Sequence, residues 1–61
     1  MIWTYLVEVG WTTRRPLLLN ERVSWVRVSG RTAAEAGLIA AQIVGTHCTM
    51  VTSTRIVSAE L

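Results

Sequence analysis

A chain of 61 residues with a net charge of +2 is expected to form one small domain, 1–61, that buries only about 60% of its unfolded surface. Domains this small commonly need disulfides, a metal or oligomerisation for stability. One cysteine and one histidine exclude an internal disulfide and a closed zinc site within one chain. Because 51% of the residues are apolar and only 16% are charged, against about 25% in ordinary soluble domains, we expect a homodimer or higher oligomer.

The first predicted element is a strand over residues 2–11, where aromatic and β-branched residues alternate with other types. One side of this strand is the most aromatic in the chain and consists of Trp3, Tyr5, Val7, Val9 and Trp11. The other side consists of Ile2, Thr4, Leu6 and Glu8. Gly10 indicates a bulge or bend near the end of the strand.

Residues 12–20 interrupt this alternation. Pro16 has no backbone N–H, so we expect a turn or a strand edge there. Arg14 and Arg15 precede it, and three leucines occupy positions 17–19. Burying one such side chain is worth roughly 1.5–3 kcal/mol. This gain favours leucines that fold back onto the core over a longer second strand or an exposed loop tip.

A second strand is predicted over residues 21–29. Val23 and Trp25 have one parity, whereas Val26 and Val28 have the other. This change of phase indicates either a bulge between the two pairs or a strand that is apolar on both faces. Both interpretations require the strand to be covered on two sides.

A helix follows, and Thr32 with Glu35 forms the capping box T-A-A-E at its start. At 100° per residue, one arc collects the side chains expected to face the sheet: Ala33, Ala36, Ile39, Ala40, Ile43 and Val44. Gly45 is placed to end the helix as a C′ residue. The opposite side carries Ala34, Leu38, Ala41 and Gln42, with Glu35 as its one charge. So few polar groups are unusual on a surface that faces water.

The final segment, residues 48–61, is rich in threonine, valine and isoleucine and is predicted to be a strand. Neither parity is clean, since Met50, Thr52, Thr54 and Ile56 alternate with Val51, Ser53, Arg55 and Val57. We expect this strand to contact protein on both faces or to extend beyond the sheet of one protomer.

The order is thus β-β-α-β, an α+β fold with a three-stranded sheet and one helix packed on one face. The helix connects the second and third strands, which run parallel if they share a sheet. One helix covers one face only. The other face, on either the Trp3/Tyr5/Trp11 side or the Ile2/Leu6 side, then needs a cover, and a second copy is the simplest one.

Residues 22–61, about two thirds of the chain, resemble short, mostly uncharacterised accessory proteins of actinobacterial phages. The likeness lies in layout and composition: an alternating strand, a capped alanine-rich helix such as Thr32-Ala33-Ala34-Glu35-Ala36, and a closing strand such as Ser53-Thr54-Arg55-Ile56-Val57. It includes no motif that carries an activity. The resemblance implies an accessory role in a phage or its host.

Residues suited to catalysis are scattered. His47 and Cys48 are adjacent, so in an extended segment their side chains point to opposite faces and do not form a nucleophile pair. The chain has no aspartate, four isolated glutamates and no glycine-rich phosphate loop. We therefore predict no enzyme, no cofactor and no metal site. No apolar run reaches the ~18 residues of a membrane span, and no basic segment precedes an apolar one as in a signal peptide, so we expect a cytoplasmic protein without membrane contact.

Binding remains as the predicted function, to a second copy and to another protein. Tryptophan, tyrosine and arginine are the types enriched at binding hot spots. The predicted interface residues are Trp3, Tyr5, Trp11, Trp25 and Leu38, and the three tryptophans share one parity. The alternative is a nucleic-acid-binding module, in which Arg14 and Arg15 contact phosphates while Trp11 stacks on a base. The absence of a longer basic stripe favours the protein interface.

Overall fold

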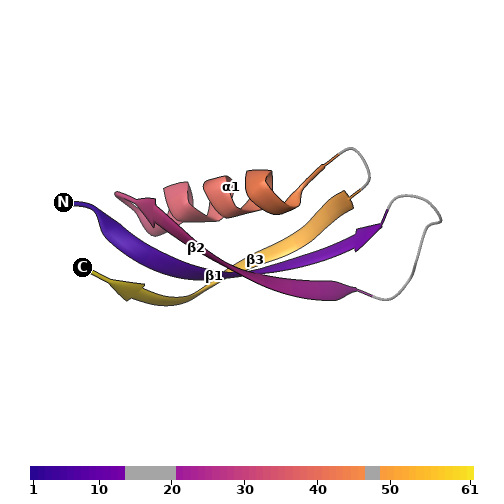
Figure 1. Ribbon diagram of the computed structural model, residues 1–61, viewed down its shortest axis with the longest axis horizontal. Coiled ribbons are helices and arrows are strands. Elements are labelled where there is room, and N and C mark those ends of the chain that lie inside the picture. Colours follow the sequence, from indigo (N-terminus) through magenta and orange to yellow (C-terminus); the bar gives the residue numbers. More distant parts are fainter. Residues whose placement is uncertain (14–20, 47–48) are drawn as a thin grey trace.

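The computed structural model describes residues 1–13, 21–46 and 49–61. These residues form four elements in chain order, strand β1 (Trp3–Thr13), strand β2 (Arg22–Gly30), helix α1 (Ala33–Val44) and strand β3 (Thr49–Glu60). The α+β class and the β-β-α-β order predicted from the sequence are confirmed (Figure 1).

Several sequence predictions concern residues outside the described part of the chain. They are the turn at Pro16, the buried leucines at positions 17–19, the nucleic-acid contacts of Arg14 and Arg15, and the pair His47 and Cys48.

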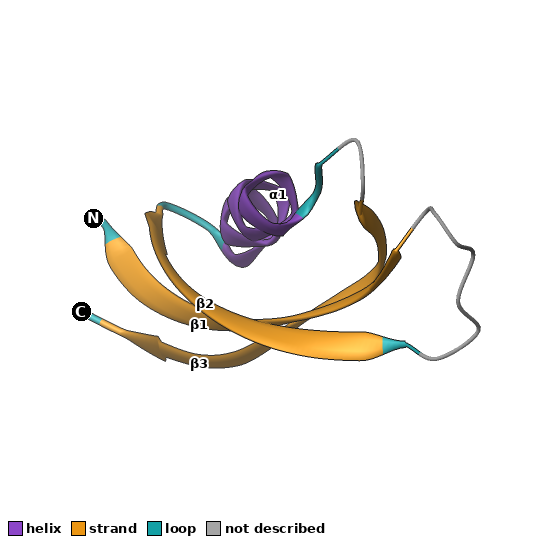
Figure 2. Cartoon of the chain, turned by 45° about the vertical axis from the view of Figure 1, so that its right-hand side comes forward, coloured by secondary structure: helices purple, strands orange, loops and turns teal. Residues whose placement is uncertain are grey.

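β1 is the central strand of a three-stranded sheet with the order β2-β1-β3, and it is antiparallel to both neighbours. The two outer strands therefore run in the same direction, as expected for strands joined through a helix. The sheet curves around α1, which lies on its concave side (Figure 2). None of the described elements lies over the convex side.

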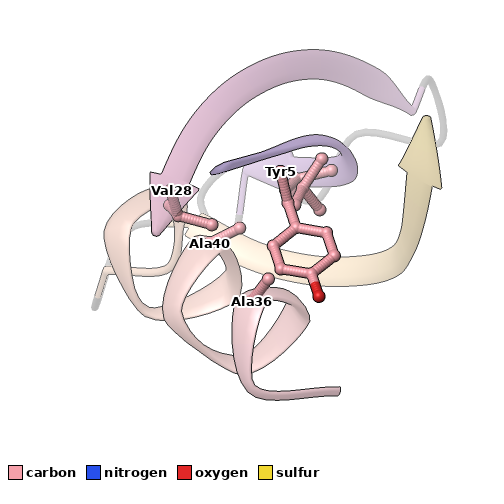
Figure 3. Packing of buried hydrophobic residues seen from close by; sticks show 6 residues of the cluster. Tyr5, Val28, Ala36 and Ala40 are labelled. Carbon is pink, nitrogen blue, oxygen red and sulfur yellow. The ribbon is translucent and has the colours of Figure 1, made fainter. Parts of the chain in front are cut away.

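α1 packs on the aromatic side of β1, which settles the alternative that the sequence left open. The buried core consists of Tyr5, Val7, Val9, Val28, Ala36 and Ala40. Figure 3 shows the Tyr5 ring next to Ala36 and Ala40 of the helix. Because the two alanines are small and fully buried, the helix backbone comes close to the sheet. The expected inner arc of the helix is confirmed at Ala36 and Ala40, whereas Ala33 and Ile43 at its edges are exposed.

The helix α1 begins directly after the predicted N-cap residue, Thr32. The Thr32 hydroxyl accepts a hydrogen bond from the backbone N–H of Glu35 at 3.1 Å. The helix ends at Val44, next to Gly45, as expected. Gly45 has φ −71°, however, so the left-handed conformation usual for a C′ glycine is not adopted. Its small size matters instead, because a Cβ there would lie 2.7 Å from the carbonyl oxygen of Ala41.

The changed phase of the second strand arises from two apolar faces rather than from a bulge. β2 pairs with β1 without a register shift, and Val26 and Val28 face α1 while Val23 and Trp25 face away. The mixed parity of β3, in contrast, arises from irregular pairing with β1. Its pairing with β1 shifts register twice, between Leu6 and Val7 and between Gly10 and Trp11. The second shift lies next to Gly10, as the sequence predicted, but the extra residue is Thr52 of β3 rather than a residue of β1.

Candidate interaction surface

The uncovered side of the sheet is the surface most exposed to a partner, and we call it the open face. Directly paired residues of neighbouring strands share a face of the sheet. The register therefore assigns the open face its members: Thr4, Leu6, Glu8, Gly10, Thr12, Val23, Trp25, Arg27, Ser29, Met50, Ser53, Arg55, Ser58 and Glu60. Ile2, which precedes β1, is also exposed and adds an apolar side chain next to this mostly polar face.

A row of three side chains crosses the centre of the open face. Glu8 of β1 is opposite Trp25 on one side and opposite Arg55 on the other. Nη2 of Arg55 donates a hydrogen bond to Oε2 of Glu8 at 2.8 Å, which makes the pair a salt bridge. The side chain of Glu8 is 28% exposed and that of Arg55 is 65% exposed. The ion pair thus holds Glu8 down on the sheet and leaves most of the Arg55 side chain accessible.

The electrostatics of this row favour an ionised Glu8. The hydrogen bond from Arg55 holds the pKa of the Glu8 carboxyl below its ordinary value, with the charge of Arg55 and a hydrogen bond from Trp25 acting in the same direction. Partial desolvation raises this pKa and opposes them. Glu8 is therefore ionised at neutral pH, and the row presents an aromatic ring, a carboxylate and a guanidinium in sequence.

A second polar contact crosses the same face over Gly10. The Glu21 carboxylate accepts a short hydrogen bond from the Thr52 hydroxyl of β3, spanning the central strand. A Cβ at Gly10 would lie 3.0 Å from Cδ of Glu21 and 2.5 Å from Oγ of Ser53. The absent side chain at Gly10 gives this contact its room.

The predicted interface residues separate into four groups, of which Leu38 is the last. Tyr5 is only 7% exposed and belongs to the core of the chain, so its side chain is not on an accessible surface. Trp3 and Trp11 are partly buried on the α1 side of the sheet. Trp25 is 63% exposed on the open face, midway along the outer strand β2. The three tryptophans thus share sequence parity but not a face, because Trp25 is opposite Glu8 rather than an aromatic residue of β1.

Leu38, the fifth predicted residue, lies on the other side of the molecule. It is 67% exposed on α1, beside a hollow of about 260 Å³ between the helix and β3. The hollow is lined by Ala33, Ala34, Gly37, Leu38, Ala41, Thr54 and Ile56. None of these side chains is charged, so this flank of α1 is an apolar surface distinct from the open face.

The sequence did not identify Glu8, Arg27, Arg55 and Glu60 as surface partners. Each is a single charge in a predicted strand, and only the register shows which charges lie side by side. The one available signal was Glu8, which is the lone charge of its segment and lies on the side of the strand opposite the aromatic residues.

Within the described residues, no group of three or more His, Cys, Asp or Glu side chains is placed to hold a metal ion. No helix in the same part of the chain has the length and apolar character that crossing a membrane requires. Comparisons with protein-family models, with curated proteins and with solved structures found no match. The surface chemistry described above is therefore the basis for a functional proposal.

Proposed function

We propose that this protein is a small self-associating binding module without catalytic activity, which uses the open face to bind a second copy of itself. The observation that carries the proposal is the exposure of Trp25 on that face, where it lies midway along the outer strand β2 and opposite Glu8. An exposed indole is the kind of anchor on which binding energy concentrates. Glu8 and Arg55 beside it supply polar contacts of both signs.

The size of the fold supports self-association. Among the residues that the structure describes, the largest fully buried side chains are those of Val7 and Val9. One layer of helix on one face of a sheet gives so small a core little apolar area, and oligomerisation is a common remedy. Large apolar side chains remain exposed elsewhere, among them Ile2, Val23 and Trp25 on or next to the open face.

The charges of the open face favour a protein over a nucleic acid. Glu8, Glu21 and Glu60 lie on or over this face, against the two arginines Arg27 and Arg55. Phosphate binding depends on an excess of positive charge, which this surface lacks. Trp11, the aromatic residue of the nucleic-acid alternative, packs its ring under the guanidinium of Arg22, 5.8 Å from the ring centroid. Within residues 1–13, 21–46 and 49–61, no observation favours the alternative, whose residues Arg14 and Arg15 lie outside these ranges.

Another protein is the second partner in the proposal. Leu38 and the adjacent hollow remain accessible when the open face is covered, because they lie on the opposite layer of the fold. A cytoplasmic accessory role in a phage or its host agrees with the layout of residues 22–61 and with a protein that acts only by binding.

Sedimentation equilibrium of two matched variants tests the proposal. Trp25→Thr removes the anchor and keeps a residue suited to a strand, and we expect it to raise the dissociation constant of the dimer by roughly tenfold or more. Leu38→Gln is the control on the opposite side and should leave dissociation unchanged. The reverse pattern would move the interface to α1. Oligonucleotide binding that falls steeply with salt and is lost on reversing Arg14 and Arg15 to glutamate would replace the proposal with the nucleic-acid alternative.

A further inference from the structure

Two charges on the open face have no ion-pair or hydrogen-bond partner within the described part of the chain. They are Arg27 of β2 and Glu60 of β3. The other charged groups of this face are engaged, since Glu8 binds Arg55 and the Glu21 carboxylate binds the Thr52 hydroxyl. Each protomer thus leaves one cation and one anion available to a partner.

Arg27 and Glu60 lie on opposite sides of the central strand. Arg27 is opposite Leu6, whereas Glu60 is opposite Thr4, one step further along the same face of β1. Neighbouring strands are about 4.8 Å apart, so the two outer strands are separated by roughly 10 Å. The two side chains therefore project from separate edges of the face, with β1 between them.

We propose that two copies pack open face against open face about a two-fold axis that runs along β1, so that Arg27 of each copy pairs with Glu60 of the other. This arrangement rests on the proposed function and specifies its geometry. A rotation about such an axis keeps the position and direction of β1 and exchanges the two sides of the sheet. β2 of one copy then lies over β3 of the other.

The same rotation brings the central rows together. Trp25 and Arg55 flank Glu8 on opposite sides, so the exposed ring of each copy meets the exposed guanidinium of the other. A cation over an indole face is a favourable contact. The two Glu8 carboxylates approach one another at the axis, and each is neutralised by its own Arg55. Leu6 of one copy meets Leu6 of the other in the next row.

The charges favour this axis over one that runs across the strands. A two-fold axis across the strands would place β2 on β2, where the acid available to Arg27 is Glu21 of the other copy. The Glu21 carboxylate is already bound to the Thr52 hydroxyl of its own chain. Glu60 has no such contact, so the axis along β1 is the one that satisfies both free charges.

Mixing two single variants tests the pairing. R27E alone places two glutamates at each contact, and E60R alone places two arginines there. Each variant should weaken its own dimer by roughly tenfold relative to the unmodified chain. In a mixture, one chain of each kind restores opposite charges at both contacts. We therefore expect a heterodimer about as tight as the unmodified dimer. An ion pair within one chain would not be restored by mixing.

Carbodiimide cross-linking gives a second measurement that leaves the charges intact. The chain has no lysine, since all six basic residues are arginines, so the R27K variant carries its one side-chain amine at position 27. We expect the reagent to join this amine to the Glu60 carboxyl of the other copy, forming an amide with loss of water. Peptide mass spectrometry of the dimer band locates the link. A link to Glu21 would overturn the axis along β1 in favour of the crossed arrangement.

The outcomes separate this arrangement from the proposed function. If the unmodified chain is a monomer at every concentration, both fail. If the unmodified chain forms a dimer that Trp25→Thr weakens, while the mixture of R27E and E60R forms no heterodimer, the open-face interface stands and the Arg27–Glu60 pairing is wrong.

Discussion

The indole N–H of Trp11 donates a hydrogen bond to the hydroxyl of Ser24, with 2.9 Å between Nε1 and Oγ. The two residues are diagonal neighbours across β1 and β2, since Trp11 is opposite Arg22 and Ser24 is opposite Val9. This bond satisfies the polar atom of Trp11 while the ring lies beneath the Arg22 guanidinium. Trp11 is therefore held within one protomer by Ser24 and Arg22, whereas the ring of Trp25 is largely exposed.

Removing the acceptor should destabilise the protomer. Ser24→Ala leaves the partly buried indole N–H without its partner, and we expect the free energy of unfolding to fall by about 0.5–1.5 kcal/mol. Urea denaturation measures the change. Ser29→Ala is the control, because Ser29 is an exposed serine on the same strand. Equal effects of the two substitutions would show that the Trp11 bond contributes nothing to stability.

The cap of α1 predicts a loss of stability when the Thr32 hydroxyl is removed. Thr32→Ala leaves the N–H of Glu35 without its acceptor and should lower the free energy of unfolding by about 0.5–2 kcal/mol. Thr32→Ser keeps the oxygen and should retain most of the stability. Thermal melting compares the two variants. Matching melting temperatures of the alanine and serine variants would contradict the role of the cap.

Substitution by alanine should change the stability of the protein in opposite directions at Gly37, which lies within α1, and at Gly45, which follows it. At Gly37 a Cβ would have its nearest contact at an ordinary 3.7 Å, from Oγ1 of Thr54. Gly37→Ala should therefore stabilise the protein by about 0.5–1 kcal/mol, through the better helix propensity of alanine. At Gly45 the clash with the Ala41 carbonyl oxygen should make the same change destabilising by about 1–3 kcal/mol.

Chemical denaturation of both glycine variants measures these changes. Because Gly45 has φ −71°, its backbone conformation is open to alanine and the cost reflects contact alone. A stabilised Gly45→Ala variant would show that the end of the helix moves to admit the methyl group. A destabilised Gly37→Ala variant would contradict the free space beside Thr54.

The parts of the fold that the sequence predicts are those that depend on patterns of neighbouring residues. The capping box located the start of α1, and alternation located β1, because both patterns depend on residues a few positions apart. Assigning side chains to a face of the sheet required more than these local patterns. Val23 and Trp25 could be assigned to a side only through their partners Gly10 and Glu8, and strand register is a long-range property. The shared parity of the three tryptophans was therefore misleading.

The predicted interface residues show the same difference between what local sequence predicts and what only the fold determines. Tyr5 belongs to a type enriched at interfaces, yet the helix alanines leave room for its ring and place it in the core. Trp25 and Leu38 are exposed, and they lie on opposite sides of the fold. Composition indicated the kinds of residue that bind, and it could not indicate which of them the fold itself uses.

The Glu8–Arg55 pair predicts a pH dependence. The pKa of Glu8 is lowered in the folded protein, so the stabilisation is present above the pKa of the unfolded state and is lost as the pH falls through the folded value. Arg55→Gln should move the pKa of Glu8 upward toward its ordinary range, since the largest cause of the shift is removed. Arg31→Gln, away from the pair, should not change it.

A carbon-detected NMR titration of the Glu8 carboxyl measures this pKa directly. Thermal melting as a function of pH adds the linked stability, and the loss on acidification should be smaller for Arg55→Gln than for the unmodified chain. An unchanged Glu8 pKa in the Arg55 variant would show that the ion pair does not form in solution.

Light scattering of the unmodified chain tests self-association most directly. One protomer has a mass of 6.8 kDa. We predict a mass at micromolar concentration that is at least twice this value and that decreases on dilution as the open faces separate. A mass near 6.8 kDa at micromolar and higher concentrations would contradict the central claim, because the open face with Trp25 would then remain uncovered in the native protein.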